Sequence, residues 1–195
     1  MKVAVIKYNA GNIRSVAFAL ERLGIAYAIT DQPEEIKSAD KVIFPGVGEA
    51  STTMRYLTEN RLDAVIKDLR QPVLGICLGM QLMCTHSDEN NTPCLGIFDE
   101  TVRLFKPTQQ QKVPHMGWNS LTLSKGWLQQ SLEGQFVYFV HSYFVPVSAQ
   151  TVATTDYIQP FSSALQKDNF YAVQFHPEKS ANAGELVLKS FFDKS

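Results

Sequence analysis

Short apolar segments alternate with amphipathic ones through the first half of the chain, and this alternation most narrows the possible folds. Residues 2–7, 25–30, 41–46 and 72–77 are brief apolar runs with many β-branched side chains. Apolar strands separated by helices are typical of a parallel sheet buried on both faces. We therefore predict an α/β fold with three layers and a mostly parallel central sheet. Helical periodicity predicts helices over residues 13–23, 49–69, 78–86 and 183–192.

The pattern changes after residue 87, where the polar stretch SDENNTPCLG predicts a surface loop. Beyond it only one short helix is expected before the last one, around residues 127–132. We expect the strands of this half to extend the same sheet, partly antiparallel. No repeat or linker interrupts the chain, so we expect a single domain over residues 1–195. The expected strands are 101–105, 113–123, 136–140, 151–156, 162–167 and 170–175.

Composition excludes several classes of function. The formal net charge is −1 and no run of Lys and Arg occurs, which argues against nucleic-acid binding. No apolar stretch approaches the roughly 20 residues of a membrane span. The first strand begins at residue 2, so we expect no signal peptide.

Three cysteines, Cys77, Cys84 and Cys94, form an odd set with irregular spacing. In a chain without export signals this predicts reduced thiols and a cytoplasmic location. Cys84, His86 and Cys94 lack the common spacings of metal ligands, so we expect neither a metal nor another cofactor.

The segment VLGICLGMQ, residues 73–81, places Cys77 between Gly75 and Gly79 where a strand runs into a helix. Gly-x-Cys-x-Gly is the thiol counterpart of the nucleophile elbow, a sharp turn whose neighbouring glycines avoid a collision. The thiol would lie above the carboxyl ends of the strands, beside a helix N-terminus that favours the thiolate. A buried structural cysteine remains the alternative, because free cysteines are often buried.

A base for this thiol is available in YAVQFHPEKS, residues 171–180. His176 and Glu178 face the same side of an extended chain, and Pro177 keeps His176 out of the helical region. Glu178 can then bind one ring nitrogen and leave the other facing a nucleophile. A strand end followed by a turn is the structural alternative. His86 is expected to be solvated, and His115 and His141 to be structural or substrate-facing.

A third segment, FPGVGEA at residues 44–50, places Gly46 and Gly48 directly after a strand. Glycines at this edge allow the backbone to approach a substrate and point N–H groups at it. The segment lacks the residues of a nucleotide P-loop. A loop that stabilises an oxyanion fits better.

In this order PGVG, GICLGMQ and FHPE resemble the class I (triad) glutamine amidotransferases. Four further segments, YNAGN (8–12), PHMGWN (114–119), YFVHSY (138–143) and QKDNFYAVQFHPEKS (166–180), are similar to the glutaminase subunits of imidazole glycerol phosphate synthases. The similarity covers essentially the whole chain. It implies the flavodoxin-like architecture of this class.

The resemblance implies a role for each matching position. Cys77 would be the nucleophile, His176 the base and Glu178 the residue that orients it. The oxyanion hole would comprise the N–H of Leu78 and one from the loop containing Val47 and Gly48. Positions that hold the substrate glutamine are Gly46, Gln81, His141, Ser142 and Tyr143.

The resemblance also implies a partner, a separate cyclase subunit that receives the ammonia and forms a heterodimer with this chain. Positions near that interface are Asn12, Met116, Trp118, Asn119 and Lys179. An exposed Met-Gly-Trp segment suits an interface, although a buried tryptophan is the commoner structural explanation. Lys7 departs from the family, which usually has an acidic residue there, so contacts near the partner surface could differ.

Three alternatives remain open. The chain could be the glutaminase of another synthase, of the anthranilate or aminodeoxychorismate type, which PHMGWN argues against. It could be a cysteine peptidase, although Gln81 and the His-Ser-Tyr segment suit a small amino-acid pocket better. It could be a non-catalytic regulatory partner, which an intact Cys77, His176 and Glu178 argue against.

Overall fold

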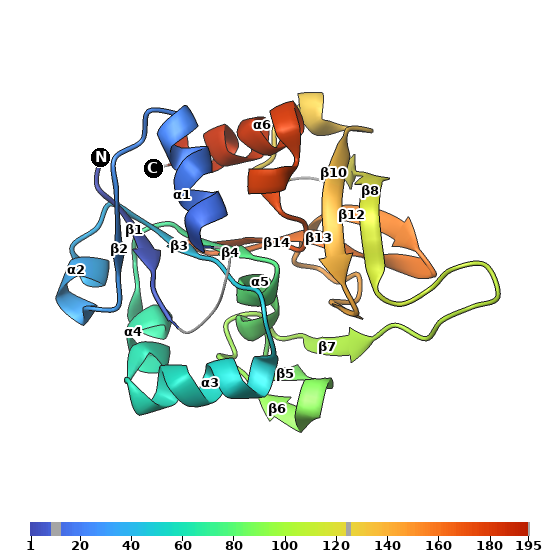
Figure 1. The fold of residues 1–195 in the computed structure, drawn as a ribbon, viewed down its shortest axis with the longest axis horizontal. Helices are drawn as coiled ribbons and strands as arrows, with labels where there is room; N and C mark the ends of the chain where they lie inside the picture. The colour runs from blue at the N-terminus through green and yellow to red at the C-terminus, as the bar shows by residue number, and fades with distance from the viewer. Residues whose placement is uncertain (9–12, 124–125, 195) are drawn as a thin grey trace.

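The computed structural model describes residues 1–8, 13–123 and 126–194, and its centre is an eight-stranded sheet (Figure 1). The strands in their order across the sheet are β2 (Tyr27–Thr30), β1 (Val3–Ile6), β3 (Lys41–Phe44), β4 (Val73–Ile76), β14 (Phe170–Val173), β13 (Gln159–Lys167), β12 (Thr151–Tyr157) and β9 (Thr122–Leu123).

The two halves of this sheet differ in strand direction. Strands β2, β1, β3, β4 and β14 are parallel, whereas β13, β12 and β9 continue the sheet antiparallel. Every residue of β1, β3, β4 and β14 is buried, as expected for a parallel sheet covered on both faces. The predicted α/β class and the antiparallel extension are both confirmed.

Helices cover the two faces in separate layers (Figure 1). Helices α1 (Ile13–Arg22) and α6 (Ala181–Phe192) lie on one face, where their apolar sides join a core with Val3 and Val5. A second core, which includes Ala4 and Ile6, lies under the helices of the other face. Those are α2 (Pro33–Lys37), α3 (Ala50–Glu59), α4 (Leu62–Asp68) and α5 (Leu78–Leu82). None of the helices described is long and apolar enough to cross a membrane.

Two expected helices are shorter than their periodicity indicated. The helix predicted over 49–69 is interrupted because Arg61 adopts the left-handed conformation (φ 57°). The helix predicted over 78–86 ends at Leu82, and its last carbonyls bond N–H groups of the segment after β6 (Thr92–Pro93): Leu95 donates to Leu82, and Ile97 and Phe98 donate to Met83. His86 therefore lies half-buried in a short strand, and its expected place at a solvated helix end is wrong.

Other strands of the second half form two small sheets of their own, so the expectation that all of them extend the central sheet is wrong. Strand β8 (His115–Ser120) pairs antiparallel with β10 (Phe136–His141). A four-stranded sheet contains β11 (Tyr143–Phe144), β7 (Thr101–Leu104), β5 (His86–Ser87) and β6 (Thr92–Pro93).

Three short 3-10 turns occur in the described parts of the chain. The helix expected over 127–132 is only the 3-10 turn η2, because the preceding Trp127 and Leu128 are buried outside any helix. The bounds of these turns are η1 (Glu89–Asn91), η2 (Gln130–Leu132) and η3 (Pro177–Lys179).

The glycines on either side of Cys77 allow β4 to run directly into α5. A Cβ atom on Gly79 would lie 2.0 Å from the Phe44 carbonyl oxygen, and one on Gly75 would lie 3.0 Å from the Gly79 carbonyl carbon. The steric reason expected for both glycines is confirmed. The helix packs so closely against the ends of β3 and β4 that only glycine fits at these two positions.

We predict that Gly79→Ala lowers the free energy of unfolding by about 3 kcal/mol, because the backbone must move to admit the methyl group. Urea denaturation measures this loss. Gly134→Ala is the control: Gly134 has a φ of 69° but open space around it, so only the left-handed conformation costs about 1 kcal/mol. Equal losses in the two variants would contradict the steric explanation.

Candidate active site

The turn after β4 holds Cys77 in a strained backbone conformation, with φ 52° and ψ −107°. The main chain is fixed on both sides: the Cys77 N–H donates to the Val173 carbonyl (2.8 Å), and the Cys77 carbonyl accepts from Gln81 N–H (3.2 Å). The side chain is almost buried, with 7% exposure. Strain of this kind persists where surrounding structure enforces it, and it is concentrated at functional sites.

His176 and Glu178 are in contact at the start of η3, as expected, but the extended chain predicted between them is wrong, because Pro177–Lys179 form a 3-10 turn. The Nδ1 atom of His176 lies 2.8 Å from Oε1 of Glu178, and both side chains are only 1% exposed. The Nε2 atom of His176 is buried without a hydrogen bond of normal geometry, and the ring interacts with the Cys77 thiol through hydrogen bonding and charge. Burial lowers the pKa of His176, but Cys77 and Glu178 outweigh it and raise this pKa to about 10.

Strand β10 positions the main chain that carries His176. The His176 N–H donates to the Tyr138 carbonyl at 2.9 Å. Ser180 accepts from the Tyr138 N–H (2.9 Å) through its hydroxyl oxygen, which in turn donates to the His176 carbonyl (2.7 Å). The histidine therefore depends on a strand outside the central sheet.

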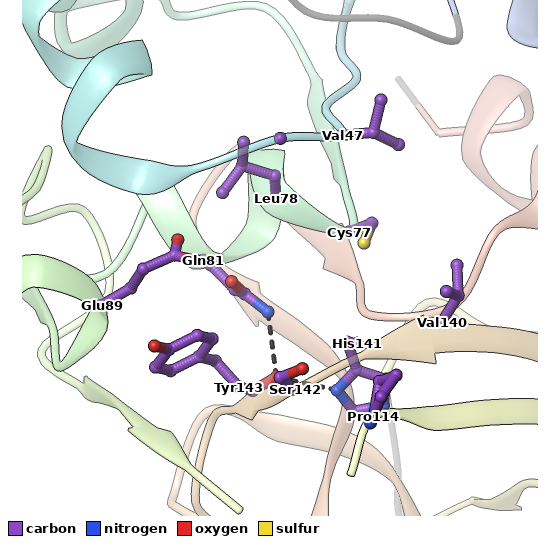
Figure 2. A pocket seen from close by; sticks show the side chains of 11 residues that line it. Val47, Cys77, Leu78, Gln81, Glu89, Pro114, Val140, His141, Ser142 and Tyr143 are labelled. Carbon is purple, nitrogen blue, oxygen red and sulfur yellow. Dashed lines mark hydrogen bonds between the residues drawn. The ribbon is translucent and has the colours of Figure 1, made fainter.

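A cavity of about 390 Å³ opens beside Cys77 (Figure 2). Its volume lies within the range of small-molecule sites. Eight of the residues singled out from the sequence line it: Val47, Gly48, Cys77, Leu78, Gln81, His141, Ser142 and Tyr143. Glu89, Pro114 and Val140 complete the lining. Gly46, His176 and Glu178 do not line the cavity; Gly46 and the His176 and Glu178 side chains are buried.

Sequence reasoning missed Glu89, the carboxylate of this cavity. It lies in η1, within the polar loop, and its carboxylate accepts the Ala50 N–H at 2.7 Å. Burial raises its pKa, and the Ala50 bond offsets part of that effect. A polar loop offers no pattern that distinguishes one such carboxylate from its neighbours.

Gln174 was also missed, and here a signal exists. Its side chain is fully buried and its Nε2 atom donates to the Cys77 sulfur at 3.6 Å. The Oε1 atom accepts from Nε2 of Gln81 at 2.9 Å. Gln174 directly follows the buried strand β14 and precedes His176 by two residues, so an amide side chain in an otherwise apolar run is the signal that indicates it.

One of the N–H groups expected in the oxyanion hole, that of Leu78, is already occupied by a carbonyl of the glycine loop after β3. The Leu78 N–H donates to the Gly46 carbonyl oxygen at 3.3 Å. Tyr8 holds the preceding peptide, since its buried hydroxyl donates to the Pro45 carbonyl. A Cβ on Gly46 would lie 2.9 Å from Cβ of Leu78. An oxyanion could bind to the Leu78 N–H only if the Gly46 carbonyl turned away.

His115 and His141 form a buried pair at the ends of β8 and β10. The Nδ1 atom of His115 lies 3.0 Å from Nε2 of His141. The ring of His115 stacks on Tyr157 and Phe139, with centroids 3.9 and 4.7 Å apart. Burial lowers the pKa of His115 to about 4 and that of His141 to about 3, although the Tyr143 carbonyl partly offsets the latter.

The outer face of β8 and β10 carries an apolar surface that we call the hairpin face, defined by Met116, Trp118 and Phe136. These side chains are 63%, 53% and 59% exposed, and large exposed apolar groups that cluster mark interaction sites. The register places Met116 opposite Val140, which lines the cavity, so the face adjoins the pocket. The alternative interpretation of Trp118 as a buried core residue is wrong.

The remaining interface candidates have different settings. Asn119 is half-buried on β8. Lys179 is exposed, with its Nζ atom 5.9 Å from the centroid of the Tyr138 ring beside the hairpin face. Asn12 lies outside the described residues. Lys7 is exposed just after β1.

The thiols are unpaired and no metal-binding arrangement is present in the part of the chain that the structure describes. Cys77, Cys84 and Cys94 are free. Burial raises the pKa of the Cys84 and Cys94 thiols, to about 12 for Cys94. No group of three or more His, Cys, Asp or Glu among the described residues could hold a metal ion.

A strained cysteine at a strand–helix turn, with a buried His–Glu pair against it, defines a cysteine hydrolase of the triad type. The family model for class I glutamine amidotransferases matches residues 4–195. The chain belongs to this family.

Curated relatives narrow the family further. The chain is 64% identical over 195 residues to the imidazole glycerol phosphate synthase subunit HisH of Bacteroides fragilis strain YCH46, covering 99% of this chain and all of the relative. Identity is 62% to HisH of Bacteroides thetaiotaomicron, with the same coverage. It is 43% to HisH 2 of Campylobacter jejuni strain RM1221, over 98% of this chain and 97% of the relative. The chain is a member of the HisH group.

Solved structures agree on the fold at much lower identity. A glutamine amidotransferase crystal structure superposes with a TM-score of 0.76 at 18% identity, over 98% of this chain and 97% of its own. A PurLQS structure from Thermotoga maritima gives 0.72 at 14% identity, over 98% and 97%. These likenesses support the α/β architecture alone.

We predict that stability falls as the pH decreases from about 6.5 toward 4. The unfolded chain binds protons on His115 and His141 near the ordinary pKa of 6.5, whereas their folded pKa values are about 4 and about 3. The unfolded state therefore binds more protons in this window, which lowers folding stability as pH falls. Urea denaturation across this range, in wild type and His115→Phe, measures the effect. The variant should lose less stability on acidification; parallel curves would contradict the assignment.

Proposed function

We propose that this chain is the glutaminase subunit of an imidazole glycerol phosphate synthase. It hydrolyses glutamine to glutamate and ammonia and delivers the ammonia to a cyclase subunit. The observation that carries the proposal is the contact of Cys77, which lines the cavity, with the buried His176–Glu178 pair. HisH relatives at 62–64% identity over the full length support the choice of synthase.

The first half of the reaction uses Cys77 as nucleophile and His176 as acid. The thiolate attacks the side-chain amide carbon of glutamine, and the carbonyl π electrons move to the oxygen as a tetrahedral oxyanion. The oxyanion then re-forms the carbonyl as the carbon–nitrogen bond breaks, while the imidazolium of His176 protonates the departing nitrogen. Ammonia leaves and a glutamyl thioester remains on Cys77. The raised pKa of His176 supports a protonated ring near neutral pH.

The second half releases glutamate. Neutral His176 accepts a proton from a water molecule as the water oxygen attacks the thioester carbonyl. The carbon–sulfur bond then breaks and the Cys77 thiolate is restored. The new carboxylic acid ionises, and ammonia takes up that proton unless it reacts first. Glu178, bonded to Nδ1 at 2.8 Å, holds the ring in position and stabilises its charged form.

Glutamine binds in the 390 Å³ cavity with its side-chain amide at Cys77. Gln81 and the main chain at His141–Tyr143 line one side, with Gly46 supporting the loop opposite. Glu89 supplies the negative charge that suits the substrate α-ammonium group, and the helix N-terminus at Leu78 lies near the reacting carbonyl. This distribution favours a free amino acid over an extended peptide, which argues against the peptidase alternative.

The oxyanion hole is formed by the Leu78 N–H together with the N–H of Val47 or Gly48. In the conformation described, the Gly46 carbonyl occupies the Leu78 N–H. Turning the Gly46–Val47 peptide would point the Val47 N–H toward the site. The same rotation would release the Leu78 N–H from the Gly46 carbonyl. We propose that partner binding favours this rearrangement, so that glutamine is hydrolysed only when ammonia can be used.

The partner is the cyclase subunit, and the two form a heterodimer through the hairpin face. Met116 and Trp118 are the apolar anchors, with Asn12, Asn119 and Lys179 as polar contacts around them. In the cyclase, ammonia reacts with a phosphoribulosyl-formimino aminoimidazole carboxamide ribonucleotide. The products are imidazole glycerol phosphate, for histidine biosynthesis, and the purine precursor AICAR.

The state of the cysteines bears on where the protein is located. Three unpaired cysteines suit a reducing compartment, so we place the chain in the cytoplasm. Residues 1–195 form a single amidotransferase domain that needs no cofactor. The close HisH relatives argue against an anthranilate-type synthase as the partner enzyme.

We predict that Cys77→Ala abolishes glutamine-dependent synthesis, because no other group can form the thioester. With the cyclase present, synthesis from free ammonium should remain within twofold of wild type, since that reaction bypasses this chain. Product formation followed by absorbance with each nitrogen source measures both rates. Glutamine turnover by the Cys77→Ala complex would disprove the nucleophile assignment.

We further predict that the isolated chain hydrolyses glutamine slowly, at least about 100-fold below the complex with cyclase and its ribonucleotide. One oxyanion-hole donor is worth about 10²–10³ in rate, and the Leu78 N–H is occupied by Gly46. Glutamate release with and without the partner measures the ratio. Equal rates would show that the loop needs no partner to open.

A further inference from the structure

A continuous series of hydrogen bonds begins at Asn119, on the side of β8 opposite the hairpin face, and passes through the buried histidine pair. Nδ2 of Asn119 lies 3.5 Å from Nε2 of His115, and Nδ1 of His115 lies 3.0 Å from Nε2 of His141. Nδ1 of His141 lies 2.7 Å from the Tyr143 carbonyl oxygen, at the wall of the glutamine cavity. Both imidazoles are buried, with 3% and 6% exposure.

The two ends of this series determine where every proton lies. The Tyr143 carbonyl can only accept, so Nδ1 of His141 carries a hydrogen. In a neutral ring Nε2 of His141 is then an acceptor, and Nδ1 of His115 must donate to it. Nε2 of His115 is left to accept from the Asn119 amide. That amide is oriented independently, because its oxygen accepts the Ser120 N–H (2.8 Å) and its nitrogen donates to the Asp156 carbonyl (3.0 Å).

The series continues from the Tyr143 carbonyl to the nucleophile. This carbonyl also accepts from Nε2 of Gln81 at 3.0 Å, and Figure 2 shows the Gln81 side chain reaching from α5 toward the segment of His141 and Tyr143. The same Gln81 nitrogen donates to Gln174, whose own nitrogen donates to the Cys77 sulfur. Both hydrogens of the Gln81 amide are thus used, which directs its oxygen away from these partners.

We propose that His115 and Gln174 are positioning residues for glutamine hydrolysis, joined in one hydrogen-bond chain from Asn119 to Cys77 whose two arms meet at the Tyr143 carbonyl, which accepts from both His141 and Gln81. His115 fixes the tautomer of His141, and His141 and Gln81 together fix the Tyr143 carbonyl. Gln174 links the Gln81 amide to the Cys77 sulfur. The chain sets the orientation in which Gln81 and Tyr143 meet the substrate. This inference rests on the proposed function.

Packing alone does not account for this arrangement. The His115 ring lies between Phe139 and Tyr157, where a phenylalanine would fill the same space without a polar atom to satisfy. A buried imidazole costs free energy unless its nitrogens are bonded, and here each nitrogen has one partner of the correct polarity. Fully satisfied buried networks specify a single arrangement of their members.

The tautomers provide a test that does not depend on activity. Long-range ¹⁵N–¹H NMR of the wild-type chain at pH 7 should show both His115 and His141 neutral, with the proton on Nδ1 in each ring. The hydrogen bond at one ring nitrogen sets which nitrogen carries the proton. A proton on Nε2 of either ring would therefore disprove the proposed series of hydrogen bonds. His115→Phe and His141→Phe assign the signals.

Kinetics of the complex with cyclase test the positioning role. His115→Phe keeps the stacking but removes both ring nitrogens. It should raise the glutamine KM about fivefold, as expected for loss of the hydrogen bond to His141, while kcat stays within twofold. His115→Asn, whose amide can donate to His141, should recover part of this loss. Asn169→Ala is the matched control, since Asn169 donates to two loop carbonyls, of Leu69 and Gln71, and should reduce stability without changing KM.

The outcomes separate this inference from the proposed function. If wild type with cyclase fails to hydrolyse glutamine, the proposed function is wrong, whatever the tautomers are. If wild type is active and folded His115→Phe has an unchanged KM, the positioning role is wrong and the function stands. A change in KM for His115→Phe without any recovery in His115→Asn would also contradict the hydrogen-bond chain, because it would show that the KM change comes from altered packing.

Discussion

The site is organised around the backbone of Cys77, which turns from β4 into α5 within one residue. A positive φ at a non-glycine residue is unfavourable, and it is maintained here by the bond to Val173 and by the approach of Gly79 to the Phe44 carbonyl. The helix can begin immediately only because that glycine has no side chain. As a result the thiol, the Leu78 N–H and the loop after β3 converge at the carboxyl edge of the sheet, where α/β folds bind ligands.

Strand β10 contributes almost as much, although it lies outside the central sheet. Its Tyr138 bonds to the main chain at His176, its Val140 lines the cavity, and its His141 anchors the hydrogen-bond chain. Its outer face, paired with β8, exposes the apolar surface proposed for the cyclase. A partner bound there would contact the strand that holds the main chain of His176, so a small shift of β10 would reach both His176 and the cavity.

Much of the fold was predictable because it depends on local patterns. Buried parallel strands have apolar sequences, and β1, β3 and β4 were placed within a residue or two. The split between α3 and α4 was not predictable, since periodicity continues through Arg61 and only its left-handed backbone interrupts the helix. The pairing of β8 with β10 was missed for a similar reason: strand patterns indicate extended chain, but not which strand is the partner.

By itself the sequence determined the chemistry of the chain. The spacing of Gly75, Cys77 and Gly79, and of His176 and Glu178, follows from local backbone geometry, so it can be recognised without coordinates. Only the tertiary structure decided what lies between them. The Gly46 carbonyl on the Leu78 N–H, Glu89 in the cavity, and the contact of Gln174 with Cys77 all join residues far apart in the chain. Such contacts arise from the packing of whole elements, which no local pattern encodes.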